Sequence, residues 1–286
     1  MGNRVSTVLA RRLGGELLRL RDAAGLTQPQ AAQALSATAA KIAKMEHGWV
    51  PFRDPDVRAL CELYGVRDEE FVARLLNLAR LDRERRKTKG WWRNDPSMGG
   101  MAEYVAMEDA ATHIRTWQLA LVPGLLQSPD YIRALGVSGD WWKHPDEIET
   151  LVDLRVKRQA RLWGDVPLQF HAVIWEAALR QEVGGPAVMR AQLNHLAEMA
   201  RRPNVNVQVL PFRAGAHDGL AGAFNLISFA EPGSIDVAYV EDKASAVWVE
   251  SMEGSAVYGK AFDRLSRASL APRDSIDLIL SISKGM

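Results

Sequence analysis

The sequence has a single cysteine and no long hydrophobic run, and each shortage excludes a class of protein. One thiol, Cys61, supports neither a disulfide framework nor a cysteine-based zinc site. No stretch approaches the roughly 18 apolar residues that a membrane-spanning helix needs. Near the start, the Arg11-Arg12 pair and Glu16 interrupt the apolar run that a signal peptide requires. We therefore expect a cytoplasmic protein in which Cys61 is a small core residue.

The signatures of common catalytic sites are also missing. The chain contains no G-x-S-x-G elbow, no P-loop, no G-x-G-x-x-G after a strand and no H-E-x-x-H. Its six histidines are scattered without the spacing of metal ligands. We predict no enzymatic activity, no metal and no cofactor. The one pair worth testing is His217-Asp218 in the Gly-rich loop 215–222, which could shape a ligand pocket, although we favour a plain turn.

The net charge of +1 conceals two parts of opposite sign. Residues 1–93 contain 18 Lys and Arg against 11 Asp and Glu, a net charge of +7. Residues 94–286 contain 18 against 24, a net charge of −6. A basic module suits DNA, because neutralised phosphates release counterions and supply most of the non-specific affinity. The length predicts about two domains, and we place them at residues 1–89 and 90–286.

The most informative segment lies between Thr27 and Gly48 and has the pattern of two short helices joined by a tight turn. Thr27 and Gln30 fit a capping box, which predicts that the first helix begins at Gln28. Thr38 is suited to cap the second helix, and Gly48 to end it in a left-handed conformation. In a helix-turn-helix protein, the second of these helices enters the major groove of DNA.

The second helix should have an inner and an outer face. Ile42 and Met45 point inward, which leaves the alanines and lysines on the surface that would meet DNA. We predict DNA contacts from this surface and from the helix starts: Gln28, Thr38, Ala39, Ala40, Lys41 and Lys44. Alanine can touch a thymine methyl group but its side chain forms no hydrogen bond. Base reading therefore falls mostly to the two lysines, with Gln28 reaching a phosphate, and we expect modest discrimination by each monomer.

Further helices complete this module. Leucines repeat at helical spacing from Leu13 to Leu20, a fourth helix opens at Asp54-Pro55 and stops at Gly65, and Asp68 caps a fifth. The fourth helix should bury Val57, Leu60 and Leu63. The pattern T-Q-x-x-A-A-x-x-L, with Ile42, Met45, Glu46 and Gly48 after it, resembles the lambda-repressor/Xre type of helix-turn-helix. An ordinary helical hairpin is the weaker alternative. The resemblance implies binding to double-stranded DNA as a homodimer, with half-sites about 34 Å apart.

A dense basic run follows the fifth helix's apolar positions. Its members are Arg80, Arg83, Arg85, Arg86, Lys87, Lys89 and Arg93, interrupted by Asp82 and Glu84. One interpretation is a basic extension along the DNA backbone, with Arg85, Arg86, Lys87 and Lys89 as contacts. The other is a solvated linker helix, and the sequence favours neither.

The second half predicts an α+β domain in which helices flank a small sheet. A helical pattern covers about 101–116. Strands are expected at 168–174, 205–212, 224–229, 236–241 and 245–249, and helices at 145–163, 186–201, 252–270 and 272–283. The fold class is therefore mainly α, with a five-helix lambda-repressor-like domain followed by an α+β part.

Several segments of this half carry a second resemblance. "MEDAATHIRTWQLALVPGLLQSPDYIRAL", "RQARL", "VGGPAVMRAQLNHLAEMARRPNVNVQVLPFRAGAH" and "VAYVED" together resemble the C-terminal domain of WhiJ-like regulators from actinobacteria. That resemblance implies a transcriptional regulator, usually a repressor, often encoded beside a small partner protein. Some relatives are described as antitoxin-like for that reason.

Candidate residues of the second half are few. Glu108, Arg115 and Gln127 match the first of these motifs, and they form either a buried polar network between helices, which we favour, or part of a binding pocket. Trp141 and Trp142, like the pair at 91–92, could anchor a partner.

Three functions fit these observations. The first is a dimeric DNA-binding regulator whose second domain senses a ligand or a partner protein. The second is an antitoxin-like protein that binds and restrains a small neighbouring gene product. An enzyme with a tethered DNA-binding domain is the third and weakest.

Overall fold

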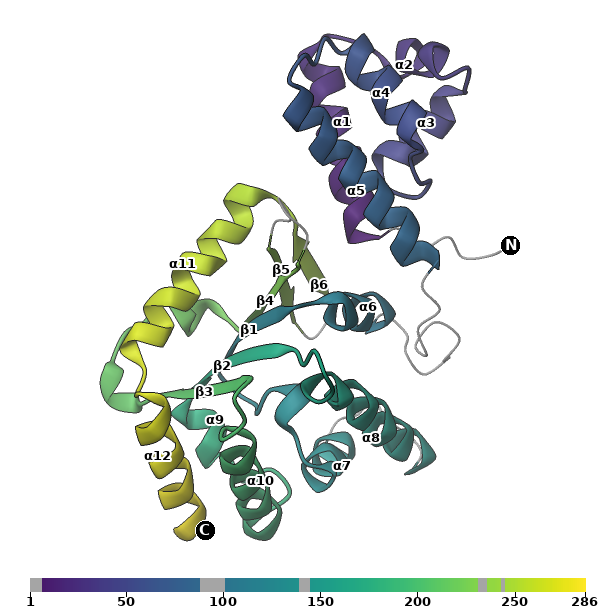
Figure 1. Ribbon diagram of the computed structural model, residues 1–286. Helices are drawn as coiled ribbons and strands as arrows, with labels where there is room; N and C mark the ends of the chain where they lie inside the picture. The colour runs from purple at the N-terminus through teal and green to yellow at the C-terminus, as the bar shows by residue number, and fades with distance from the viewer. Residues whose placement is uncertain (1–6, 88–100, 139–144, 231–235, 243–244) are drawn as a thin grey trace. The chain divides into compact units, whose positions relative to one another are not determined.

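The computed structural model describes residues 7–87, 101–138, 145–230, 236–242 and 245–286 (Figure 1). The chain divides into two compact units, residues 1–93 and 94–286. In the described part of the chain, no helix combines the length and the apolar character needed to cross a bilayer.

The N-terminal unit contains the five expected helices. They are α1 (Val8–Ala23), α2 (Gln28–Ala34), α3 (Ala39–Glu46), α4 (Asp54–Leu63) and α5 (Glu69–Lys87). The capping box is present, since the Thr27 N–H donates to Gln30 Oε1 at 2.8 Å and α2 begins at Gln28 as predicted. Thr38 caps α3 by accepting a hydrogen bond from the Lys41 N–H at 3.2 Å. Gly48 follows α3 with φ of +73°.

The five helices enclose one apolar core, in which Cys61 lies as expected. Leu13, Leu17, Ile42 and Met45 are each about 99% buried, so α1 and α3 pack closely. The prediction for Leu63 was wrong, because this residue is 38% exposed. The buried stripe of α4 continues instead through Cys61 to Tyr64, which keeps helical spacing with Val57 and Leu60.

Close packing of α1 on α3 depends on a glycine. A Cβ atom at Gly14 would lie 2.2 Å from the backbone oxygen of Glu46 and 2.6 Å from that of Met45. Because both atoms belong to backbone, no side-chain rotation can relieve the contact. Gly14 therefore sets the distance between these two helices.

The C-terminal unit is built on a six-stranded mixed sheet with strand order β3-β2-β1-β4-β5-β6. The strands are β1 (His113–Gln118), β2 (Gln169–Trp175), β3 (Val205–Leu210), β4 (Phe224–Ser228), β5 (Val237–Glu241) and β6 (Ala246–Val249). The first three pair in parallel, and β1-β4, β4-β5 and β5-β6 pair antiparallel.

The central strand is a correction to the expected helix over 101–116. Helix α6 (Ala102–Ala110) ends early, and β1 begins at His113. The segment His-Ile-Arg-Thr-Trp-Gln is rich in β-branched and aromatic residues, which favour strands. Pairing with β2 on one side and β4 on the other fixes it as a strand.

Helices cover both faces of the sheet (Figure 1). They include α7 (Pro129–Ser138), α8 (Pro145–Gln159), α9 (Glu176–Arg180), α10 (Pro186–Met199), α11 (Met252–Ala268) and α12 (Pro272–Lys284), and short 3-10 turns such as η3 (Gly124–Leu126) and η4 (Ala160–Leu162) join them. Helix α11 contacts β1, β3, β4 and β5. On the opposite face, Tyr104 of α6 packs on Tyr239 of β5, with ring centroids 4.7 Å apart. The expected α+β arrangement is confirmed.

Candidate DNA-binding surface and a polar cavity

The outer face of α3 has the exposure that a recognition helix needs. Ala40 and Lys44 are exposed, and Ala39 and Lys41 are partly exposed. The exposed Thr38 holds the first turn of the helix through its cap. These five predicted contact residues, on the helix and at its start, are therefore all at least partly exposed.

A buried polar network holds the inner side of α3. Arg21 of α1 donates from Nε to Glu46 Oε1 at 2.7 Å, and from Nη1 to the Leu26 carbonyl at 2.7 Å. Gln28 Nε2 donates to Glu46 Oε2 at 2.8 Å. The hydrogen bond to Glu46 raises the pKa of Arg21. The network connects α1, the start of α2 and the end of α3. Gln28, which we predicted to contact a phosphate, is part of this network and is half-buried.

The turn between α2 and α3 contains a strained residue. Ser36 has φ of +49°, and no other non-glycine residue of the described chain has a positive φ. A left-handed backbone conformation costs an L-residue about 1–2 kcal/mol, which glycine avoids. The tight turn expected from the sequence is therefore present, at a local cost in conformational energy.

The basic run on α5 is partly tied into the domain. Arg83 binds Asp54 at 2.7 Å and the Phe52 carbonyl at 2.9 Å. Arg86 binds Asp82 at 2.8 Å and the Gly48 carbonyl at 3.0 Å. These two arginines thus hold α5 against the loops beside α3 and α4, a role that neither interpretation of the run anticipated.

The rest of the run contributes less to the structure. Arg80 forms an exposed ion pair with Glu84 at 2.8 Å, and Lys87 is exposed at the end of α5. Lys89, like the side chain of Arg85, lies outside the described residues. The proposed path of the basic run along the DNA backbone stays a prediction.

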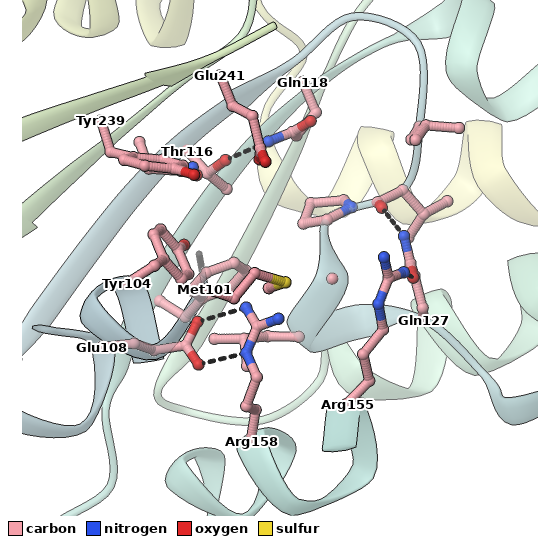
Figure 2. A pocket seen from close by; sticks show the side chains of 17 residues that line it. Met101, Tyr104, Glu108, Thr116, Gln118, Gln127, Arg155, Arg158, Tyr239 and Glu241 are labelled. Atoms are coloured by element: carbon pink, nitrogen blue, oxygen red, sulfur yellow. Dashed lines mark hydrogen bonds and ion pairs between the residues drawn. The ribbon is translucent and has the colours of Figure 1, made fainter. Parts of the chain in front are cut away.

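In the C-terminal unit, a cavity of about 160 Å³ lies on the sheet face turned away from α11 (Figure 2). Strands β1, β2, β4 and β5 supply its floor, and α6, η3 and α8 supply its walls. Two of the three residues from the first motif, Glu108 and Gln127, line it together. Polar side chains from the floor include Thr116 and Gln118, which share a 2.9 Å hydrogen bond.

One side of the cavity is an ion pair buried almost completely. Arg158 of α8 donates to both carboxylate oxygens of Glu108 at 2.8 and 2.9 Å. Its guanidinium carbon also lies 5.3 Å from the ring centre of Tyr104. Burial alone would lower the pKa of Arg158, but the facing Glu108 carboxylate raises it. This pair forms the buried polar bridge that we favoured for Glu108, between α6 and α8.

The other side holds Arg155, one turn earlier on α8. Arg155 Nη1 donates to Gln127 Oε1, and Gln127 Nε2 donates to the Val122 carbonyl at 2.7 Å. The Nε of Arg155 is buried and makes no hydrogen bond in the described structure. Burial, together with the neighbouring Arg158 guanidinium, lowers the pKa of Arg155 to about 10.

Arg115 does not join this group. Strand alternation places it on the opposite sheet face, where it pairs with Asp236 and lies 5.9 Å from the Phe262 ring centre of α11. Arg155 and Arg158 are absent from the predicted site, because the helical pattern over 145–163 does not show which of its charged residues lie on the packed face. Their three-residue spacing, which puts both on one helix face, was the available signal.

The loop around His217 is a packed turn. His217 Nδ1 accepts a hydrogen bond from the Gly219 N–H at 3.1 Å, and its ring packs edge-on against Trp117 with centroids 5.2 Å apart. Trp117 Nε1 donates to the Gly219 carbonyl at 3.0 Å. Burial lowers the pKa of His217. Trp141 and Trp142 lie outside the described residues, as does the pair at 91–92.

No group of three or more His, Cys, Asp and Glu side chains in the described ranges is placed to hold a metal ion.

Comparison with known proteins gave two family matches. Residues 12–75 match a helix-turn-helix domain, which indicates DNA binding and a role in transcription regulation. No curated protein and no solved structure matches the chain. Residues 101–281, more than half of the chain, match a domain of unknown function (DUF5753), and the protein therefore belongs to that family.

Proposed function

We propose that this protein is a sequence-specific transcription regulator that binds double-stranded DNA as a homodimer, with α3 in the major groove. The observation that carries the proposal is the division of α3 into two faces. Ile42 and Met45 are buried in the core, Glu46 is locked by Arg21, and the opposite face presents Lys41 and Lys44 to solvent. A rigid helix with a free basic face is what major-groove recognition requires.

Charge supports the same conclusion. The N-terminal unit, residues 1–93, carries a net charge of +7, whereas residues 94–286 carry −6. The DNA phosphates attract the basic unit and repel the acidic one. These two forces orient the chain with its basic unit toward the duplex. Repression then follows if the operator overlaps a promoter, and the C-terminal unit is the part that receives a signal.

The base-reading side of α3 is sparse. Ala39 and Ala40 offer methyl contacts with thymine only, and two lysines are the hydrogen-bond donors. Specificity in this proposal therefore comes from pairing two half-sites in a dimer and from DNA shape, more than from any one monomer.

The test is fluorescence anisotropy of the full chain on DNA from upstream of its own gene. Lys41→Ala with Lys44→Ala should weaken binding strongly without changing the melting temperature. The matched control is Arg58→Ala with Arg67→Ala, which removes the same charge from exposed positions outside α2 and α3. Equal losses of DNA affinity in both double variants would mean that only the total positive charge matters. An unchanged DNA affinity in the lysine variant would mean that α3 does not contact DNA.

A second measurement addresses the partner. The family resemblance implies a small partner protein encoded beside this gene, and adding that protein should alter DNA binding if it is the signal for the C-terminal unit. A stable stoichiometric complex that leaves DNA binding unchanged would instead favour the antitoxin-like role.

A further inference from the structure

The two arginines in the cavity differ in one respect that bears on ligand binding. Arg158 has a carboxylate partner, because Glu108 accepts both of its hydrogen bonds. Arg155 has none, since no carboxylate of the described residues lies within 4 Å of its guanidinium, and its one hydrogen bond to those residues goes to the neutral amide of Gln127. Figure 2 shows both side chains rising from α8 into the same space.

A buried guanidinium without a carboxylate costs free energy. Charged groups in protein interiors are normally paired, because desolvation is not otherwise offset. The depressed pKa of Arg155 is the signature of that cost. A guanidinium that lines a cavity and has no carboxylate partner is a candidate for binding a negatively charged ligand.

The free nitrogen of the guanidinium fits a carboxylate. Gln127 occupies Nη1 and Nε is buried, so Nη2 is left as the nitrogen that is neither buried nor hydrogen-bonded in the described structure. A charged N–H donor of this kind binds a carboxylate oxygen well. Arg158 is already neutralised by Glu108, so Arg155 is the one guanidinium of the cavity without a carboxylate of the described residues within 4 Å. A single charge of this kind suits a monoanion better than a phosphate dianion.

The rest of the lining limits the size and character of the ligand. Apolar side chains from Leu121, Leu125 and Phe170 line the cavity beside the polar groups. Its volume of about 160 Å³ is close to that of the roughly 150 Å³ protein cavity known to accept benzene. The space therefore admits an apolar group about as large as one aromatic ring.

We propose that this cavity binds a small organic monocarboxylate, with the carboxylate on Nη2 of Arg155 and the apolar part against Leu121, Leu125 and Phe170. The site belongs entirely to the C-terminal unit, so the proposal does not depend on DNA binding. If the regulator proposal also holds, this ligand is a candidate for the signal that the C-terminal unit receives.

The test uses benzoate as the probe and the full chain as the protein. Isothermal titration calorimetry at constant ionic strength should detect benzoate, while the neutral isostere benzamide and inorganic phosphate should bind at least about ten-fold more weakly. Arg155→Met should weaken benzoate binding by about 10- to 100-fold, the effect of losing charged hydrogen bonds. Lys157→Met, which removes an exposed charge from the same helix, should bind as the wild type does.

A structural role for Arg155 makes the opposite prediction for the free protein. If the arginine serves the ligand, Arg155→Met leaves the melting temperature of the unliganded protein unchanged or raises it. A clear fall would mean that Arg155 stabilises the fold, and it would overturn the proposal. So would the failure of acetate, benzoate and phenylacetate alike to bind the wild type.

Glu241 supplies a second, independent variant. It lies exposed at the cavity rim and attracts Arg155 without forming an ion pair within 4 Å. Glu241→Gln should tighten benzoate binding, because it removes a negative charge that repels the carboxylate. Weaker binding in this variant would contradict the assignment of a simple carboxylate.

Discussion

The two units use buried arginines in opposite ways. In the N-terminal unit, Arg21 is 7% exposed and pairs with Glu46, 25 residues away along the chain, so the charge pair joins two helices of the fold. In the C-terminal unit, Arg155 lines the cavity, is partly buried, and pairs with no carboxylate of the described chain. An arginine paired with a carboxylate of the chain stabilises the fold, whereas an arginine without such a partner can bind the carboxylate of a ligand.

Removal of Glu46 would make Arg21 resemble Arg155 and should change stability more than the other substitutions below. Glu46→Ala removes the buried partner of the Arg21 guanidinium and leaves it only the exposed carboxylate of Asp22, which should cost about 3–5 kcal/mol in the free energy of unfolding. Urea unfolding monitored by circular dichroism would measure it. Arg21→Met with Glu46→Leu should recover most of the loss. If Glu46→Ala costs less than about 1 kcal/mol, the pair is not part of the scaffold.

The second test concerns the contact that brings Glu46 close to α1. Gly14→Ala should destabilise the N-terminal unit by about 1–3 kcal/mol or more, since the new methyl group meets backbone atoms. Gly15→Ala is the matched control, because a Cβ there has nothing within 4 Å. That control should gain about 0.5–1 kcal/mol from helix propensity. Equal effects at both positions would show that α1 and α3 do not pack as described.

A smaller change in stability is expected at the turn before α3. Ser36→Gly should stabilise the N-terminal unit by about 0.5–1 kcal/mol, because glycine tolerates the positive φ at this position. Ala37→Gly, at the next residue and without a positive φ, should instead destabilise it slightly. Differential scanning calorimetry distinguishes the two. A loss of stability in Ser36→Gly would mean that the serine side chain has a role in the turn.

The N-terminal unit could be predicted from sequence because its signals are local. The Thr27 capping box, the Thr38 cap and Gly48 each act within a few residues of their own position. Such signals locate helix starts and ends without knowledge of the tertiary structure. Leu63 was misjudged because only packing decides which side of the last helical turn is covered.

The C-terminal unit could be predicted less completely, since its decisive contacts are distant in sequence. Strand β1 pairs with β2 and β4, which begin more than 50 and more than 100 residues later, respectively. Glu108 and Gln127 were found from a motif, but the same motif included Arg115, which faces the other side of the sheet. The spacing of Arg155 and Arg158 shows that they share one helix face, but only the fold shows that this face lines a cavity.

If the scaffold built on the Arg21–Glu46 pair holds α3 for sequence-specific recognition, as we propose, competition binding will show it. The full chain is bound to a labelled fragment from upstream of its own gene at physiological salt. An unlabelled upstream fragment and a scrambled one of equal length and composition then compete. We expect the upstream fragment to compete at least about 1,000-fold more effectively, as specific sites do. Equal competition by both fragments would contradict the claim.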